Sequence, residues 1–208
     1  MSTTAPARRP RRDAAANRAG ILSAAATTIA HDPHASIDTI ARAAGLSRRA
    51  LYGHFDDRDA LLHELITAGA ARFNAIAATV DETDPAPVAL ARLTARLWTE
   101  AAHVQVAAAI ALDETHVEST AAALAPLRRT VAAIVRRGQD DGSLRTDLTA
   151  ATVARLVEET ARTVVTRVDA SSPAAEPLAV RAVLSIAGLS WREADAVLST
   201  LPPSPQEP

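Results

Sequence analysis

Apolar positions along most of the chain recur every three or four residues, which is the period of an α-helix with one buried face. The first such stripe follows a predicted N-cap at Asp13 and runs through Ala15, Arg18, Leu22, Ala25 and Ile29. Pro33 disfavours a helical conformation at the residue before it, so the first helix is predicted to end near His31.

Two short helices joined by a sharp turn are predicted next. Ser36 is suited to cap a helix that ends at Gly45, and Ser47 is suited to cap a second helix that runs to Phe55. Only Gly45 and Leu46 lie between the two segments, so the chain has to reverse within a few residues. This pattern is typical of a helix-turn-helix.

The rest of the chain also has helical periodicity. A fourth helix is predicted to start at Asp56 or Asp57 and to continue to Val80, and one-sided stripes follow over residues 90–104, 124–135, 153–168, 178–189 and 191–201. The segment from Val180 to Leu189 is apolar on most faces, which favours burial against a second subunit. Glu158 and Arg162 have the i,i+4 spacing of a helical ion pair. The predicted fold class is all-α.

The composition supports this class. Of 208 residues 50 are alanine, the strongest helix former, and the chain has no cysteine, which excludes disulfides and thiolate metal sites. No apolar run reaches the roughly 18 residues of a membrane span, so we expect a cytoplasmic protein. Residues 1–12 are polar and basic and are predicted to form a disordered arm, and residues 202–208 a tail.

Charge is unevenly distributed along the chain. The formal net charge of -2 divides into +3 for residues 1–80 and -5 for residues 81–208. A basic N-terminal part suits a polyanion, and the acidic remainder favours a neutral or cationic apolar ligand.

The second short helix carries the residues with the clearest chemistry. Leu51 and Phe55 are spaced to anchor it to a core, which leaves Arg48, Arg49 and Tyr52 to project elsewhere. An arginine fork matches guanine O6 and N7, and a tyrosine hydroxyl can bond a phosphate oxygen. Two arginines on a short helix are more often simply solvated, but here the cap, turn and anchors all have the spacing of a helix that enters a DNA groove.

The stretches Ser36–Ser47 and Leu51–Leu62 together resemble the DNA-binding motif of the TetR family of transcriptional regulators. The resemblance implies a homodimer with a three-helix DNA-binding domain at residues 13–60 and a helical ligand-binding and dimerisation domain at residues 61–201. It also implies a regulator of duplex DNA, most often a repressor that a small-molecule effector releases from a palindromic operator.

The resemblance assigns roles by position. Arg48 and Arg49 correspond to base-reading residues, Ser47 begins their helix, and phosphate contacts fall to Thr39, Tyr52 and His54. One departure lies at the start of the fourth helix, where the family often has lysine. Here three aspartates, Asp56, Asp57 and Asp59, surround Arg58 and would repel a phosphate.

Candidates for a second site are fewer. A pocket in an alanine-rich domain needs large planar side chains for its walls, and these are scarce in this chain, so we predict an effector pocket lined by Trp98, His103 and His116. The alternative for Trp98 is a place in the core. No nucleophile elbow, HExxH motif or phosphate loop is present, so we expect no enzymatic activity and no cofactor. Two alternatives stay open: a helical metalloenzyme that uses His103, Asp113 and His116, and a DNA-binding scaffold whose C-terminal domain binds a protein.

Overall fold

The computed structural model describes residues 10–102, 117–169 and 171–202, and within these ranges every regular element is a helix. The prediction of an all-α fold is confirmed. The chain divides into two compact units after Leu65, and each unit is considered by itself below. No helix in the described ranges is long and apolar enough to cross a bilayer.

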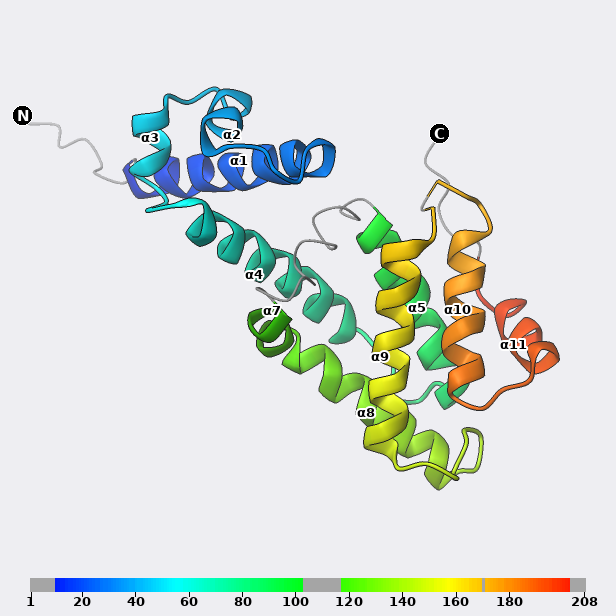
Figure 1. Ribbon diagram of the computed structural model, residues 1–208. Coiled ribbons are helices and arrows are strands. Elements are labelled where there is room, and N and C mark those ends of the chain that lie inside the picture. Colours follow the sequence, from blue (N-terminus) through cyan, green and yellow to red (C-terminus); the bar gives the residue numbers. More distant parts are fainter. Residues whose placement is uncertain (1–9, 103–116, 170, 203–208) are drawn as a thin grey trace, which may run out of the picture. The chain divides into compact units, whose positions relative to one another are not determined.

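The first unit consists of three helices and the beginning of a fourth (Figure 1). These are α1 (Pro10–His31), α2 (Ile37–Ala43), α3 (Arg48–Tyr52) and the N-terminal part of α4 (Arg58–Ala77). Side chains from all four form its core, and those that are almost completely buried include Ile21, Ala25, Ile29, Ile40, Leu51 and Leu61.

Two details of α1 differ from the prediction. The helix begins at Pro10, so Asp13 lies inside it and the predicted N-cap is wrong. Proline is well suited to the first turn, because its φ is preset and its missing N–H would have no helical partner. The buried stripe passes through Ile21 rather than Leu22, which is only half-buried. The predicted end of α1 at His31 is confirmed.

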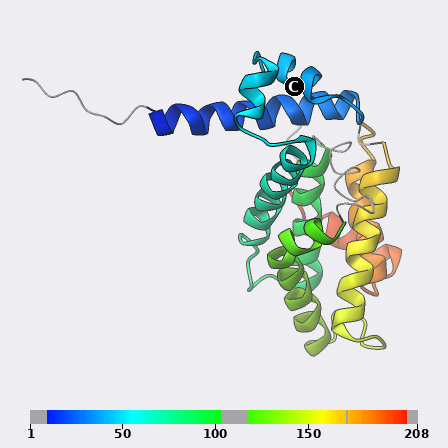
Figure 2. The ribbon, with the colours of Figure 1, turned by 60° about the vertical axis from the view of Figure 1, so that its left-hand side comes forward.

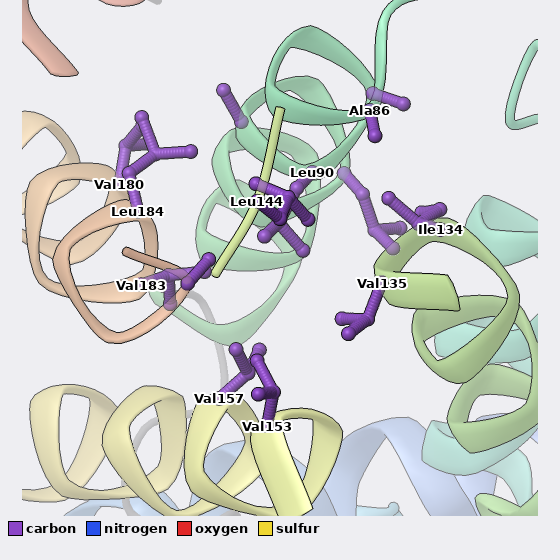
Figure 3. Packing of buried hydrophobic residues seen from close by; sticks show 14 of the residues in the cluster. Ala86, Leu90, Ile134, Val135, Leu144, Val153, Val157, Val180, Val183 and Leu184 are labelled. Atoms are coloured by element: carbon purple, nitrogen blue, oxygen red, sulfur yellow. The ribbon is translucent and has the colours of Figure 1, made fainter. Parts of the chain in front are cut away.

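The second unit contains α5 (Ala86–Ala102), α7 (Val117–Ala123), α8 (Ala125–Asp140), α9 (Ala150–Arg167), α10 (Ala175–Ile186) and α11 (Trp191–Leu198). Helices α9 and α10 pack against each other, and α10 also packs against α5 and α11 (Figures 1 and 2). Side chains from α5, α8, α9 and α10 meet between these helices, together with Leu144 from the turn after α8 (Figure 3).

The apolar segment near the C-terminus is buried within its own chain, and the prediction that it is buried against a second subunit is wrong. Val180, Val183, Leu184 and Ala187 are all completely buried, and other helices of the same chain cover them. They therefore need no second subunit. On α10 it is Leu178 that stays 46% exposed.

The predicted Glu158–Arg162 pair is also wrong. Arg162 pairs with Glu159, and Glu158 accepts from Arg128 on α8, with its Oε1 3.0 Å from Arg128 Nε. Because helix α9 packs against α8, Arg128 lies close enough to Glu158 to pair with it in place of Arg162.

Candidate nucleic-acid interface

Helix α2 begins and ends as the sequence predicts. The Ser36 hydroxyl accepts a hydrogen bond from the Thr39 amide at 3.2 Å, which satisfies one free N–H of the first turn. After the helix, Gly45 has a φ of +70°, and the Leu46 amide donates to the Ala41 carbonyl at 2.8 Å. Such a left-handed residue closes the helix end and redirects the chain toward α3.

Helix α3 is short and firmly seated. Ser47 caps it by accepting from the Ala50 amide at 3.2 Å, as predicted. The predicted anchors are buried, with Leu51 at 0% and Phe55 at 3% exposure. The helix ends at Tyr52 rather than Phe55, because Gly53, a poor helix former, follows. The chain still turns as a helix would, since the Phe55 amide donates to the Leu51 carbonyl at 3.0 Å.

The face of α3 opposite these anchors is open to solvent. Ser47, Arg48 and Arg49 are exposed, and Tyr52 is 39% exposed. The Arg49 side chain makes no hydrogen bond or ion pair with any residue that the structure describes, and only its backbone carbonyl accepts, from the Gly53 amide at 3.2 Å. A short capped helix with two arginines and a tyrosine on its outer face can donate hydrogen bonds to base edges and phosphates.

Arg48 is held by two neighbours. Its Nη1 donates to Asp38 Oδ2 of α2 at 3.0 Å, and its guanidinium carbon lies 5.4 Å from the centre of the Tyr52 ring. Hydrogen bonding to Tyr52 and the negative charge of Asp38 raise the pKa of Arg48 above its ordinary value. The guanidinium is therefore charged and restrained at the surface.

The other two residues assigned by resemblance are less exposed. Thr39 and His54 are both half-buried, and Thr39 Oγ1 lies 3.0 Å from Ser36 Oγ. The His54 ring has no hydrogen-bond partner in the described part of the chain, although the backbone carbonyl of this residue accepts from Arg18 at 2.7 Å. Thr39 lies on α2 and His54 follows the end of α3.

Arg18 makes structural contacts beneath this surface that the sequence did not reveal. Its Nε donates to Glu64 of α4 at 2.6 Å, its Nη1 reaches the His54 carbonyl, and its guanidinium stacks 4.4 Å from the Phe55 ring centre. The hydrogen bonds to Glu64 raise the pKa of Arg18 above its ordinary value. One side chain therefore joins α1, the end of α3 and α4. Its only sequence signal was a charge within an otherwise apolar helix face.

The Arg58 side chain bonds backbone carbonyls of its own unit and is not free to contact a phosphate. It donates to the Pro33 carbonyl at 2.7 Å and to the Ala35 carbonyl at 3.3 Å, and so fixes the connection between α1 and α2. Asp57 caps α4 by accepting from the Ala60 amide at 2.7 Å. Asp57 thus begins the helix, and Arg58 next to it supports the fold.

The predicted effector pocket is only partly within the described residues. Trp98 is 6% exposed and packs against Val164, Ala175 and Ala179 of α9 and α10. His103 and His116 lie outside the described residues, as does Asp113 of the alternative metal site. Within the ranges that the structure describes, no group of three potential metal ligands comes together. The pocket therefore stays a prediction.

Comparisons with known proteins agree with this geometry. The model of the bacterial regulatory proteins of the tetR family matches residues 21–65, the segment that contains α2, α3 and the start of α4. No curated protein matches the chain.

Several solved structures share the fold. FadR from Bacillus halodurans, a fatty acid degradation regulator, is 18% identical, with a TM-score of 0.71 over 90% of this chain and 97% of that one. PfmR from Thermus thermophilus, a TetR family transcriptional regulator, is 23% identical, with a TM-score of 0.69 over 82% and 98%. FadR from Bacillus subtilis, solved with stearoyl-CoA, is 16% identical, with a TM-score of 0.70 over 82% and 97%. At these identities the likeness is one of fold.

Proposed function

Because the chain is a TetR-family regulator by its N-terminal domain, we propose that it represses transcription by binding a palindromic DNA operator as a homodimer, from which a small molecule releases it. The observation that carries this proposal is the construction of α3. Its cap and anchors fix the helix in the core, and its basic side chains are exposed on the opposite face. Two copies would enter successive major grooves about 34 Å apart.

The proposed roles follow from the chemistry of each side chain. Arg48 and Arg49 have forked guanidinium groups that can bond two acceptors of one guanine. Tyr52 and His54 carry single polar groups suited to a phosphate oxygen, as does the hydroxyl of Thr39. The backbone amides that follow Ser47 add donors and a positive dipole end at the start of α3. Base contacts would give sequence preference and phosphate contacts would give general affinity.

The first experiment tests DNA binding itself. Duplexes selected from a random pool by the purified full-length protein should converge on two inverted half-sites. Recovery of direct repeats or of no preferred sequence would contradict the proposed mode of binding.

Substitutions at Arg48 and Tyr52 should have different effects. Arg48→Ala is expected to cost about 1–3 kcal/mol in binding and to relax preference at one base pair of each half-site, because a bidentate base contact is lost. Tyr52→Phe removes only a hydroxyl and should weaken all sequences nearly equally. Affinities for every single-base variant of the selected duplex measure both effects. A uniform loss for Arg48→Ala together with a changed base preference for Tyr52→Phe would show that the roles are reversed.

Homodimer formation is supported by residues other than those first expected. Leu156 of α9 and Leu178 of α10 are 38% and 46% exposed, and the two helices that carry them pack together. A contiguous exposed apolar patch is typical of an interaction surface, and we propose that these two side chains belong to one such patch. These two helices are also the long helices nearest the C-terminus in the described chain.

The mass in solution tests this assembly. Light scattering at micromolar concentration should give twice the chain mass of 21.7 kDa, and the double substitution Leu156→Glu with Leu178→Glu should give 21.7 kDa. Ala133→Glu places one glutamate at an exposed position of α8, outside the proposed surface, and should leave the dimer intact. A wild-type monomer, or a dimer that survives both glutamates, would refute the proposed surface.

Release by an effector is proposed to act through α4. This helix contributes residues to both compact units, so a change in its position is a direct way to alter the spacing of two DNA-reading helices. An effector can shift the population only if it binds the released geometry more tightly. The stearoyl-CoA bound to FadR of Bacillus subtilis shows that one protein of this fold accommodates a long apolar chain.

A further inference from the structure

A carboxylate lies beside the proposed base-reading arginine. Asp38 Oδ2 accepts from Arg48 Nη1 at 3.0 Å, across the turn that separates α2 from α3. The side chains are 44% and 63% exposed, respectively, so the pair is at the surface that would meet DNA. A negative charge at such a surface is unexpected, because it repels every phosphate that approaches.

Asp38 is rigidly placed. It is the second residue of α2, and its neighbours Ile37 and Ile40 are buried in the core of the unit. Its second oxygen, Oδ1, is itself buried and accepts no hydrogen bond from a described residue. Arg48 is the ion-pair partner of this carboxylate, which also lies in the first turn of α2, where the helix dipole favours a negative charge. The carboxylate is thus a fixed point to which the long arginine side chain is tied.

Arg48 is restrained on its other side as well. Its Nη2 lies 3.5 Å from the Tyr52 hydroxyl, at the limit of a hydrogen bond, and its guanidinium lies over the Tyr52 ring. A free arginine side chain has many rotamers, and ordering it on binding is unfavourable. A guanidinium held between a carboxylate and a ring has already lost much of that freedom, and its remaining N–H groups are still available for a base.

We infer that Asp38 is a positioning residue that sets the DNA sequence preference of Arg48, an inference that rests on the proposed base-reading role of Arg48. The carboxylate aims the arginine fork at base edges and opposes its use as a general phosphate contact. It also disfavours complexes in which the guanidinium finds no base acceptor. Specificity is a difference between affinities, and a group that weakens the wrong complexes raises it.

An alternative is that the pair only stabilises the fold. Ion pairs with this degree of exposure contribute little to stability. Asp38→Asn should therefore leave the thermal unfolding midpoint of the full-length protein close to the wild-type value. The readout that separates the two roles is base discrimination, which a contribution to folding alone would not change.

The test compares Asp38→Asn with a matched control. Asp56→Asn removes the same charge from an exposed residue of the same unit that has no partner in the described chain. The probes are the duplex selected by the wild-type protein, its single-base variants, and a scrambled duplex of the same length. Arg48→Ala first identifies the base pair that Arg48 reads.

At that base pair, Asp38→Asn is expected to lower discrimination by about fivefold or more, a sizeable part of what one bidentate contact provides. Affinity for the scrambled duplex should rise, since a repulsive charge is gone. Asp56→Asn should retain wild-type discrimination. The double variant Asp38→Asn with Arg48→Ala should discriminate no less than Arg48→Ala alone, because both changes act through one guanidinium.

The outcomes separate this inference from the proposed function. If Asp38→Asn keeps wild-type discrimination while Arg48→Ala loses it, the inference is overturned and the proposed function stands. An equal loss in Asp56→Asn would assign the effect to net charge and would also overturn the inference. If the wild-type protein selects no sequence from the pool, or if Arg48→Ala retains full discrimination, the role of Arg48 fails and the inference fails with it.

Discussion

Phe55→Ala is expected to lower the free energy of unfolding of the first unit by about 3–5 kcal/mol, the usual range for a buried phenylalanine. Phe55 is 3% exposed and lies under the Arg18 guanidinium, which also bonds the adjacent His54 carbonyl and Glu64. Removing the ring leaves a cavity below the end of α3 and one side of Arg18 without its contact. DNA affinity should fall along with stability, because the anchor fixes the helix that carries Arg48 and Tyr52.

Urea titration measures this loss, and amide hydrogen exchange locates it. Exchange should accelerate in α3 and the first turns of α4, whereas the amides of α10 should be unaffected, since they belong to the other unit. Phe55→Leu is the matched control, because it retains most of the apolar volume and should cost about 1 kcal/mol. Equal costs for the alanine and leucine variants would mean that the ring is not a packing anchor.

Gly188→Ala is expected to destabilise the second unit by about 3 kcal/mol, through backbone strain and overpacking together. Gly188 has a φ of +108°, and a Cβ at this position would lie 2.6 Å from Arg145 Cβ and 3.0 Å from Arg145 N. The same Arg145 amide donates to the Ala187 carbonyl at 2.9 Å, which joins the turn after α8 to the end of α10. The methyl group would force these two segments apart.

Gly142→Ala separates the two causes. Gly142 also has a positive φ, +75°, but nothing lies within 4 Å of its would-be Cβ. This substitution should cost only the strain of about 1–2 kcal/mol. Thermal unfolding of both variants gives the comparison, and a Gly188→Ala variant no less stable than Gly142→Ala would exclude the close approach to Arg145 as a cause.

The residues that cap and end the short helices could be identified from the sequence. Ser36 and Ser47 cap their helices, and Gly45 adopts the positive φ that the end of α2 requires. These features depend on residues within one helical turn of each other, so their chemistry is contained in short stretches of sequence. The same locality explains why the motif around α3 could be recognised from the sequence and matches the family model.

Burial and partner choice were decided by the tertiary structure. The stripe on α1 could have been drawn through Leu22 or Ile21, since both have helical spacing, and only packing against the rest of the unit selects Ile21. The apolar residues of α10 looked unpartnered, yet helices distant in sequence cover them. Glu158 similarly contacts Arg128, thirty residues away, instead of the arginine one turn further along α9.

The same division applies to the candidate site. The sequence by itself determined which side chains α3 exposes, because Leu51 and Phe55 fix the face that must be buried. Only the fold brings Arg18 to Glu64 and Asp38 to Arg48, since each pair joins separate helices. Helical periodicity specifies which face of a helix is apolar, but charged side chains are long and can choose among several partners. That choice depends on how the helices are arranged in three dimensions.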